Sequence, residues 1–214
     1  MGSEMCIRDS PKDGTPLVEC TFCLPFGTVQ NTPIYYCGKI DTAIEDNNGV
    51  WSFDHKTAFQ FGETFTAMMQ MDGGQLGYCW ALGQVLKRPV TGYIIDAVRI
   101  RRPTRASSRS VEFGGVESPV DASDFARLPF PIPYASTLED WRSDTLALIA
   151  DILWHHDRGY FPRHRWNCTN KFGKCDFFEV CSAPREQREA ILYHSTLYEE
   201  STWSPLKQKT KEKQ

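Results

Sequence analysis

Two apolar segments around a short polar turn constrain the fold of this chain more than any other feature. Residues 34–46 and 50–57 are rich in Ile, Tyr, Val, Trp and Phe, and they flank the tetrapeptide Asp46-Asn47-Asn48-Gly49. Asn-Gly is the strongest short-range hairpin signal, because both residues tolerate the positive φ angles of a tight turn. The sequence therefore predicts an antiparallel hairpin with Asn48 and Gly49 as its two-residue loop.

The two faces of this hairpin differ in chemistry, since side chains alternate along a strand. The expected register sets Asp41 opposite Lys56 and Ala43 opposite Asp54, so that Asp41, Asp54 and Lys56 share one face. The opposite face is apolar and suited to burial, and it carries Ile40, Ile44, Trp51 and Phe53. The polar face offers the oxygen ligands that Mg²⁺ or Mn²⁺ prefers, and a cation for a phosphate or a nucleophile. The alternative is a solvated hairpin with a weak surface ion pair between Asp41 and Lys56.

Three short motifs follow one another here, Gly38-Lys39-Ile40-Asp41, Asp54-His55-Lys56 and Gln75-Leu76-Gly77-Tyr78. In order and spacing they resemble motifs II, III and IV of the RecB-like branch of the PD-(D/E)XK nuclease superfamily. The resemblance implies an α/β fold with a restriction-endonuclease-like core, a mixed sheet flanked by helices. It also implies a metal-dependent deoxyribonuclease.

The resemblance implies a role for each matching residue. The ligands of a catalytic Mg²⁺ or Mn²⁺ would be Asp41, Asp54 and the backbone carbonyl of His55. Lys56 would position the nucleophile, and Gln75 and Tyr78 would contact DNA as the remaining catalytic pair. The family usually spaces its Gln and Tyr four residues apart, whereas here they are three apart. Both spacings keep the pair on one face of a helix.

A second signal lies in three cysteines near the C-terminus, Cys168, Cys175 and Cys181. Three closely spaced thiols within residues 161–181, a segment without a long apolar run, indicate a metal or a cluster more than packing. A subset of RecB-like nucleases, including the CRISPR adaptation exonucleases and many phage relatives, holds a [4Fe-4S] cluster with one upstream and three downstream cysteines. The resemblance therefore implies such a cluster in a C-terminal helical, cysteine-bearing cap.

The fourth cluster ligand stays open. Cys20 and Cys23 form a Cys-x-x-Cys in a predicted strand over residues 17–24, where positions three apart point to opposite faces. Cys37 and Cys79 are predicted as small core residues, because free cysteine is among the most buried residue types.

The N-terminal region lacks one feature of the family. Residues 1–10, which include Cys6, are typical of a tag or sequence-assembly artefact. Motif I, usually a His or an acidic residue, should precede Gly38, and Glu19 is the one plausible acidic substitute and a fourth candidate metal ligand. We therefore expect an N-terminally truncated copy of a longer protein.

Composition fits one globular domain over residues 11–203. The chain has 214 residues, of which 41% are hydrophobic and 13% aromatic. No apolar run reaches membrane-spanning length and no secretory signal is visible. The eight cysteines, three of them clustered, fit reduced thiols and a metallocofactor better than a disulfide framework. A cytoplasmic location in a bacterial or phage-infected cell is expected.

The net charge of -3 does not by itself indicate a nucleic-acid binder, so the distribution of charge matters. A predicted strand over residues 90–101 and the loop after it carry a basic group without acidic residues between its members, Arg99, Arg101, Arg102, Arg105 and Arg109. This group predicts a phosphate track for DNA. Arg163, His164 and Arg165 form a second group, and residues 204–214 a disordered basic tail.

The remaining organisation is coarse. Helices are predicted over residues 63–71, 75–87, 138–156 and 184–200, and residues 103–133 are expected to form a long loop or a short hairpin.

Two function classes follow. The first is a DNA exonuclease acting on single strands or ends in phage or mobile-element recombination, with a helicase or recombination protein as a further expected partner. The second is a catalytically silent DNA-binding or scaffold module on the same fold, because motif I is absent. A zinc-ribbon adaptor is a third and weaker idea.

Overall fold

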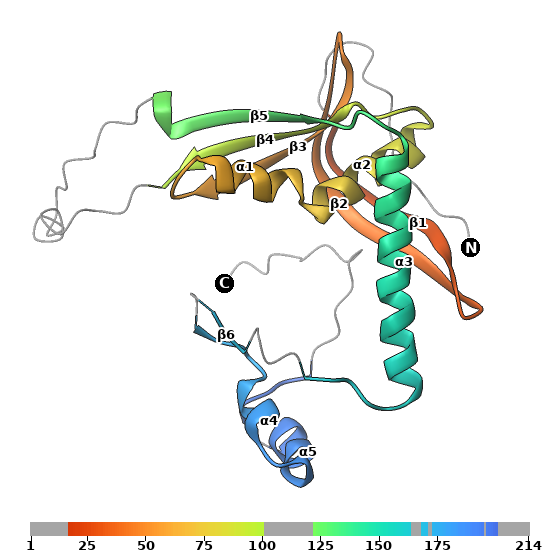
Figure 1. Cartoon of the computed structure of the whole chain (residues 1–214), viewed down its shortest axis with the longest axis vertical. Coiled ribbons are helices and arrows are strands. Elements are labelled where there is room, and N and C mark those ends of the chain that lie inside the picture. The colour runs from red at the N-terminus through yellow and green to blue at the C-terminus, as the bar shows by residue number, and fades with distance from the viewer. Residues whose placement is uncertain (1–16, 101–121, 164–167, 171–172, 195, 201–214) are drawn as a thin grey trace, which may run out of the picture. The chain divides into compact units, whose positions relative to one another are not determined.

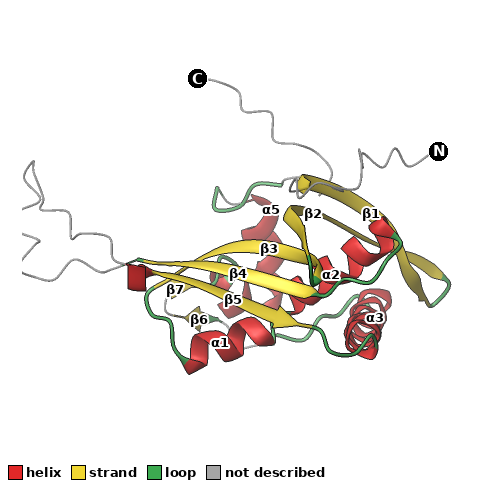
Figure 2. Ribbon diagram, turned by 90° about the horizontal axis from the view of Figure 1, so that it is seen from above, coloured by secondary structure: helices red, strands yellow, loops and turns green. Residues whose placement is uncertain are grey.

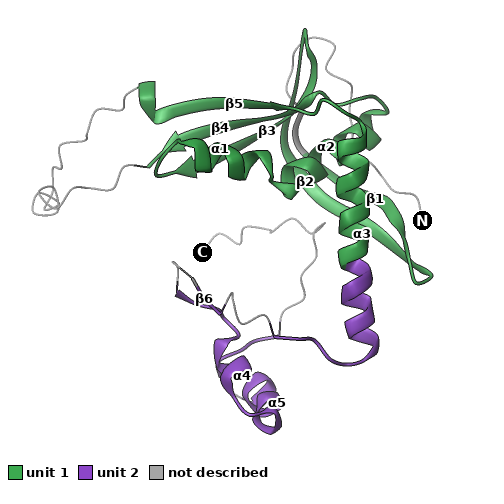
Figure 3. Ribbon diagram, in the orientation of Figure 1, with its two compact units in different colours: residues 1–148, 205–214 green, residues 149–204 purple. Residues whose placement is uncertain are grey.

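The computed structural model describes residues 17–100, 122–163, 168–170, 173–194 and 196–200. Contacts within the chain divide it into two compact units, residues 1–148 with 205–214 and residues 149–204 (Figure 3). The predicted leader at 1–10 and the predicted tail at 204–214 lie outside the described residues. The single nuclease domain over 11–203 stays a prediction.

A five-stranded mixed sheet forms the centre of the first unit (Figure 1). Its strands are β1 (Leu17–Val29), β2 (Thr32–Asp46), β3 (Gly49–Ala58), β4 (Gly92–Arg99) and β5 (Phe125–Pro131). They lie side by side in this order, as Figure 2 shows from above, with β3 and β4 parallel and all other neighbours antiparallel. The expected mixed α/β sheet flanked by helices is confirmed at this level.

The hairpin of β2 and β3 is present, but its register differs from the predicted one. Asp46 pairs with Gly49, so the loop is Asn47-Asn48 and not Asn48-Gly49. The Asp46 carboxylate accepts hydrogen bonds from the Asn48 backbone N–H at 2.8 Å and from the Trp51 indole at 3.1 Å. This Asx-type turn closes the loop one residue earlier than the Asn-Gly pattern indicated. Relative to the predicted register, each residue of β2 faces a residue of β3 two positions earlier. Because this shift is an even number, each side chain keeps its predicted face.

Strand β5 was not predicted, because residues 103–133 were expected to form a long loop or a short hairpin. A short 3₁₀ turn over Ala122–Asp124 leads into it, and β5 then pairs with β4 from Gly92↔Pro131 to Val98↔Phe125. Its prolines concealed a strand that lies at the edge of the sheet, where a missing N–H is tolerated.

Two helices cover the face of β3 and β4 that carries Asp54 and Tyr93. The Tyr93 hydroxyl donates to the carbonyls of Met69 and Gln70, at 2.9 and 3.2 Å, at the end of α1 (Glu63–Gln70). Helix α2 (Gly73–Leu86) is mostly buried. The helices predicted over 63–71 and 75–87 are confirmed, with α2 beginning at Gly73 because Asp72 caps it through the Gly74 N–H.

The long helix predicted over residues 138–156 is confirmed as α3 (Ser136–Asp157). Its Trp141 ring lies 5.6 Å from both Phe26 of β1 and Tyr36 of β2, and Trp80 of α2 joins the same cluster. Aromatic pairs at these separations stabilise the fold by more than the burial of their surface area alone. The cluster fixes α2 against the β1–β2 hairpin.

The second unit has short elements. They are the rest of α3, the two-stranded hairpin of β6 (Thr169–Asn170) and β7 (Gly173–Lys174), and the helices α4 (Phe178–Ser182) and α5 (Arg185–His194). The predicted helix over 184–200 is therefore shorter than expected, since α5 ends at His194. Among the described helices of the whole chain, none is long and apolar enough to cross a membrane.

Candidate active site

Two of the predicted site residues project from the same face of β3, two positions apart. Asp54 is buried, and its Oδ2 lies 2.7 Å from Nζ of the half-buried Lys56. Burial alone lowers the pKa of Lys56, but the hydrogen bond and charge of Asp54, together with the charge of Asp72, raise it above its ordinary value. Lys56 is therefore a cation at neutral pH.

Asp41 lies beside Asp54 on the neighbouring strand. The pairing of β2 with β3 reaches Thr42↔Phe53, and one further step along this register sets Asp41 opposite Asp54. Both carboxylates act on the hydroxyl of Tyr78, whose pKa is raised by burial first and then by the charges of Asp41 and Asp54. The structure thus brings the side chains of Asp41, Asp54 and Tyr78 to the site that also contains Lys56.

Gln75 lies one helical turn before Tyr78, so the two share a side of α2. It is 1% exposed. Its Oε1 accepts no hydrogen bond from any described residue. A buried acceptor without a partner costs about 1–3 kcal/mol. A cation or a donor that entered the site would recover this energy.

Asp72 is a member of the site that was not predicted from the sequence. It caps α2 through the Gly74 N–H at 2.9 Å. Its charge acts on both Lys56 and Tyr78. The pattern Asp-Gly-Gly before an apolar helix is a helix-start signal, and it could have located this carboxylate at the α2 end of the site.

His55 projects from the opposite face of β3. Its ring is largely exposed, and Nδ1 lies 3.4 Å from Oδ2 of Asp96 on β4. The Oδ1 atom of Asp96 accepts from Nε of Arg127 on β5 at 3.0 Å. The imidazole therefore belongs to a charged network on the other side of the sheet. Only the backbone of His55 remains for the predicted carbonyl ligand.

Glu19, the predicted substitute for motif I, lies on β1. Its neighbours Val18 and Cys20 pair with Thr42 and Ile40, so the backbone of Glu19 runs beside that of Asp41. The sheet register therefore places Glu19, Asp41 and Asp54 in one row across three adjacent strands.

The predicted phosphate track is described only at Arg99. This residue pairs with Ala58 at the end of β3, and its guanidinium lies 5.1 Å from the centre of the Phe61 ring. One of its nitrogens lies 3.9 Å from Oδ1 of Asp124. The predicted partners Arg101, Arg102 and Arg105 lie outside the described residues.

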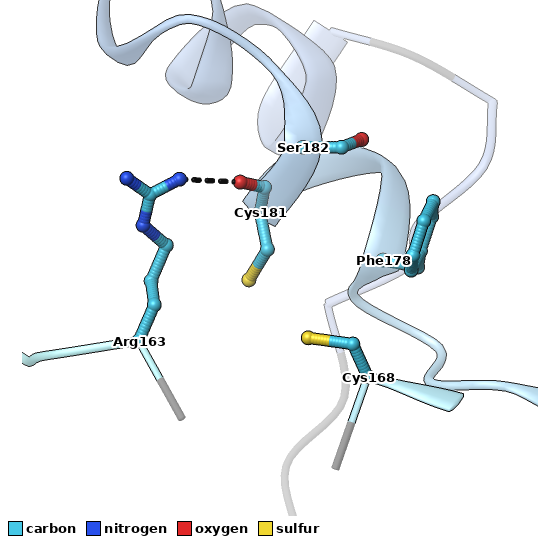
Figure 4. Close-up of a pocket in the computed structure, with 5 residues that line it drawn as sticks. All are labelled: Arg163, Cys168, Phe178, Cys181 and Ser182. Carbon is cyan, nitrogen blue, oxygen red and sulfur yellow. Dashed lines mark hydrogen bonds between the residues drawn. The ribbon is translucent and has the colours of Figure 1, made fainter. Parts of the chain in front are cut away.

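The C-terminal cysteines surround a small hairpin and the helix after it. The backbone N–H of Cys175 donates to the Cys168 carbonyl at 3.0 Å, so β6 and β7 set these residues opposite each other. Cys181 lies on α4, and its sulfur and that of Cys168 point into one pocket of about 290 Å³ (Figure 4). Arg163 donates to the Cys181 carbonyl at 2.7 Å at the same pocket.

Neither metal site is complete in the part of the chain that the structure describes. No group of three or more His, Cys, Asp or Glu side chains there is arranged to hold a metal ion. The catalytic metal and the iron–sulfur cluster therefore stay predictions.

Comparison with known proteins gives little. Neither the protein-family models nor the curated proteins yield a match to this sequence. One solved structure, described as the crystal structure of SSO0001, aligns with 72% of this chain and 55% of its own, at 14% identity and a TM-score of 0.38. The chain thus spans about half the length of that protein. A similarity at this level assigns neither a fold family nor a function.

Proposed function

We propose that the protein is a Mg²⁺- or Mn²⁺-dependent deoxyribonuclease with a PD-(D/E)XK core. The observation that supports this most strongly is the arrangement of Asp41, Asp54 and Lys56: the register sets Asp41 beside Asp54, and Asp54 Oδ2 lies 2.7 Å from Nζ of Lys56. Asp72, the N-cap of α2, adds a carboxylate whose charge acts on Lys56. An excess of carboxylates attracts a hard divalent cation.

The donor set suits such a cation. Asp54 Oδ2 contacts the Lys56 ammonium, and the described residues donate no further hydrogen bond to it and none to Gln75 Oε1. Asp41 is exposed, so its carboxylate is accessible to a ligand from solvent. Asp41 and Asp54, with the His55 carbonyl and Glu19, would hold the ion. When bound, the ion supplies acidification of a water and charge stabilisation at the scissile phosphate.

The protein side chains have separate tasks in this proposal. Lys56, kept protonated by Asp54, donates hydrogen bonds to the attacking oxygen or to a phosphate oxygen. Tyr78 stays protonated because its pKa is raised, so its hydroxyl remains a donor for the DNA backbone. Gln75, in the first turn of α2, is 1% exposed, so its amide would reach DNA only after a movement of the helix.

We further propose that DNA ends or single strands are the substrate, and that Arg99 continues with Arg101, Arg102 and Arg105 as a phosphate track. Arg99 lies on the β4 position that pairs with the end of β3, the strand that carries Lys56. Its guanidinium lies over the Phe61 ring and 3.9 Å from Asp124, so a phosphate would compete with that carboxylate for it. A helicase or recombination partner and a cytoplasmic location belong to the same proposal.

The iron–sulfur cluster is proposed for Cys168, Cys175 and Cys181. Supporting observations are the shared pocket of Cys168 and Cys181 and the pairing of Cys175 with Cys168 across the hairpin. The three would supply thiolate ligands from the loop and from α4, the cysteine-bearing cap.

One observation favours the alternative, a silent DNA-binding module. The Lys56 ammonium sits 2.7 Å from the Asp54 oxygen that a metal would use, so the described state is already charge-paired at that oxygen. A DNA-binding module without chemistry would bind DNA through the same basic residues.

A cleavage assay separates the two. End-labelled single-stranded and blunt duplex DNA are incubated with the full chain in Mg²⁺, Mn²⁺, Ca²⁺ or EDTA, with the variant Asp54→Asn beside it. Asp96→Asn is the matched control, because Asp96 carries the same group on the opposite face. The proposal requires Mg²⁺- or Mn²⁺-dependent products that vanish in Asp54→Asn and persist in Asp96→Asn. DNA binding without products in every metal would establish the alternative.

A further inference from the structure

Two cysteines far from the C-terminal group face each other across the first hairpin of the sheet. The register of β1 with β2 makes Cys23 the direct partner of Cys37. Burial, followed by interaction with the Cys23 thiol, raises the pKa of Cys37 to about 11. Opposed residues on antiparallel strands have Cα atoms about 4.5–5.5 Å apart. A disulfide needs a Cα separation of about 4.4–6.8 Å.

This pair differs from the other cysteines of the sheet unit. Cys20 pairs with Ile40, and Cys79 is fully buried on α2. Cys23 and Cys37 are both half-buried, so a small reagent can reach them. They therefore combine proximity with access, which neither Cys20 nor Cys79 does.

We propose that Cys23 and Cys37 form a reversible disulfide by exchange with a small-molecule disulfide. The thiolate of one cysteine attacks the reagent, its S–S bond breaks, and one reagent thiol leaves. The second protein thiolate then attacks the mixed disulfide and releases the second reagent thiol. The protein pair loses two electrons and two protons, and the reagent disulfide is reduced to two thiols.

The new bond would lock the β1–β2 hairpin through its middle. It closes the chain from position 23 to position 37 around the turn at Gln30 and Asn31, which both have positive φ. Cys37 lies four residues before Asp41, and β1 carries Glu19 beside Asp41. Oxidation would therefore hold β1 against the strand that bears the candidate site. This inference is independent of the proposed nuclease function.

Peptide mapping tests the bond directly. The full chain is treated with oxidised glutathione, remaining thiols are alkylated, and the protein is digested with chymotrypsin, which cleaves after aromatic residues. Phe26 and Tyr36 lie between the two cysteines, so the digest yields them on separate peptides. We expect one disulfide-linked pair that contains Cys23 and Cys37, and its loss after treatment with dithiothreitol. Recovery of both as free thiols, or each with its own glutathione, would overturn the proposal.

A stability measurement provides the second readout. Oxidation closes a loop of 15 residues, for which the unfolded chain loses enough entropy to raise the thermal midpoint by about 6–12 °C. The shift should be absent in Cys23→Ser and retained in Cys20→Ser, which removes a thiol from the same strand without an opposing partner. An equal shift of the thermal midpoint in the parent and in Cys23→Ser would show that other cysteines cause it, and would contradict the proposal.

Discussion

The two units of this chain hold their candidate sites in opposite ways. In the sheet unit, Asp54 and Gln75 are themselves buried, within a core that includes Phe22, Ile40, Leu82 and Ile95. In the second unit, no described residue of 149–204 is buried, and its helices α4 and α5 bury none. Apolar burial is the main favourable contribution to folding, so the described residues of the second unit lack most of what stabilises the first.

The difference indicates what each site needs. The sheet positions Asp54 and Lys56 by packing and register, before any ligand is bound. A segment without a core needs a staple, such as a disulfide or a metal, to be ordered. The three cysteines near β6, β7 and α4 could supply such a cross-link by binding a metal cluster, which is why we propose an iron–sulfur cluster there.

The sharpest test of the sheet unit is Lys56→Ala. Loss of one preorganised charged donor from a reaction centre lowers the rate by about 10²–10³-fold. We expect that loss in metal-dependent DNA cleavage, with an unchanged circular dichroism spectrum, because the core does not depend on the half-buried Lys56. Lys56→Arg, which keeps the charge, should retain part of the activity. Equal cleavage by parent and Lys56→Ala would remove Lys56 from the site.

The same comparison predicts the reverse outcome in the second unit. There, Cys181→Ser should lower the local stability of the fold more than it lowers DNA cleavage. If a bound cluster orders this unit, its loss should speed proteolysis within residues 149–204 at least tenfold, about 1.4 kcal/mol of local stability. Cleavage within the sheet should not change. Ser182→Ala, the next residue on α4, is the matched control.

Limited proteolysis followed by mass spectrometry locates the cut sites, and the visible absorption of an iron–sulfur protein reports the cluster itself. Proteolysis of Cys181→Ser at the parent rate, in protein without visible absorption, would show that the unit is ordered by other means.

Much of the sheet could be predicted from the sequence because its signals are local. Alternation of apolar and polar residues indicated β2 and β3. The helix predicted from Gln75 begins two residues earlier, at Gly73, because the Asp72 side chain caps it. The loop of the hairpin was wrong by one residue because the Asp46 side chain closes the turn, and propensity alone does not include that hydrogen bond. Strand β5 was missed since its prolines are acceptable only at an edge, which is a tertiary fact.

The residues of the candidate site also divide into those that the sequence could predict and those that it could not. Strand alternation grouped Asp41, Asp54 and Lys56, whereas Gln75 and Tyr78 were added through the resemblance to RecB-like nucleases. The sequence could not show that the charge of Asp72 acts on Lys56, because this depends on how α2 packs against β3. The outward position of the His55 ring follows from alternation, but its partners Asp96 and Arg127 come from strands distant in sequence.

The packing of α2 against the β1–β2 hairpin provides the next test of how the sheet unit is stabilised. A Cβ at Gly77 would lie 2.3 Å from the Tyr36 hydroxyl oxygen and 2.9 Å from a carbon of the Trp141 ring. Gly77→Ala should therefore lower the free energy of unfolding by about 1–3 kcal/mol, the usual cost of overpacking. Gly83→Ala, on the same helix, meets only ordinary contacts at 3.5 Å and beyond, and should be neutral or stabilising.

Urea unfolding followed by tryptophan fluorescence measures both variants. A Gly77→Ala protein as stable as the parent would show that α2 can move away from Tyr36 without cost. The contrast between the rigid sheet unit and the second unit would then be weaker than proposed.

The smallest expected effect is a loss of stability in alkali that depends on Tyr36. Burial, with a further contribution from Tyr78, raises the pKa of Tyr36 from 10.0 to about 12. A raised pKa means that the folded state keeps a proton which the unfolded state releases. The contribution is therefore complete below about pH 10 and is lost as the pH rises toward about 12. Since the ring is only partly buried, we expect a loss of about 1–2 kcal/mol across this interval.

Tyr36→Phe should flatten this part of the stability profile, because phenylalanine has no proton to release. Tyr198→Phe removes a hydroxyl that donates to the Asp176 carbonyl in the second unit, and it should leave the alkaline profile of the sheet unit unchanged. Urea midpoints measured at pH 9 and above for the parent and both variants provide the comparison. A parent slope that Tyr36→Phe reproduces in full would assign the alkaline loss to other buried groups of the sheet, Tyr93 and Cys79, whose pKa values burial raises to about 12.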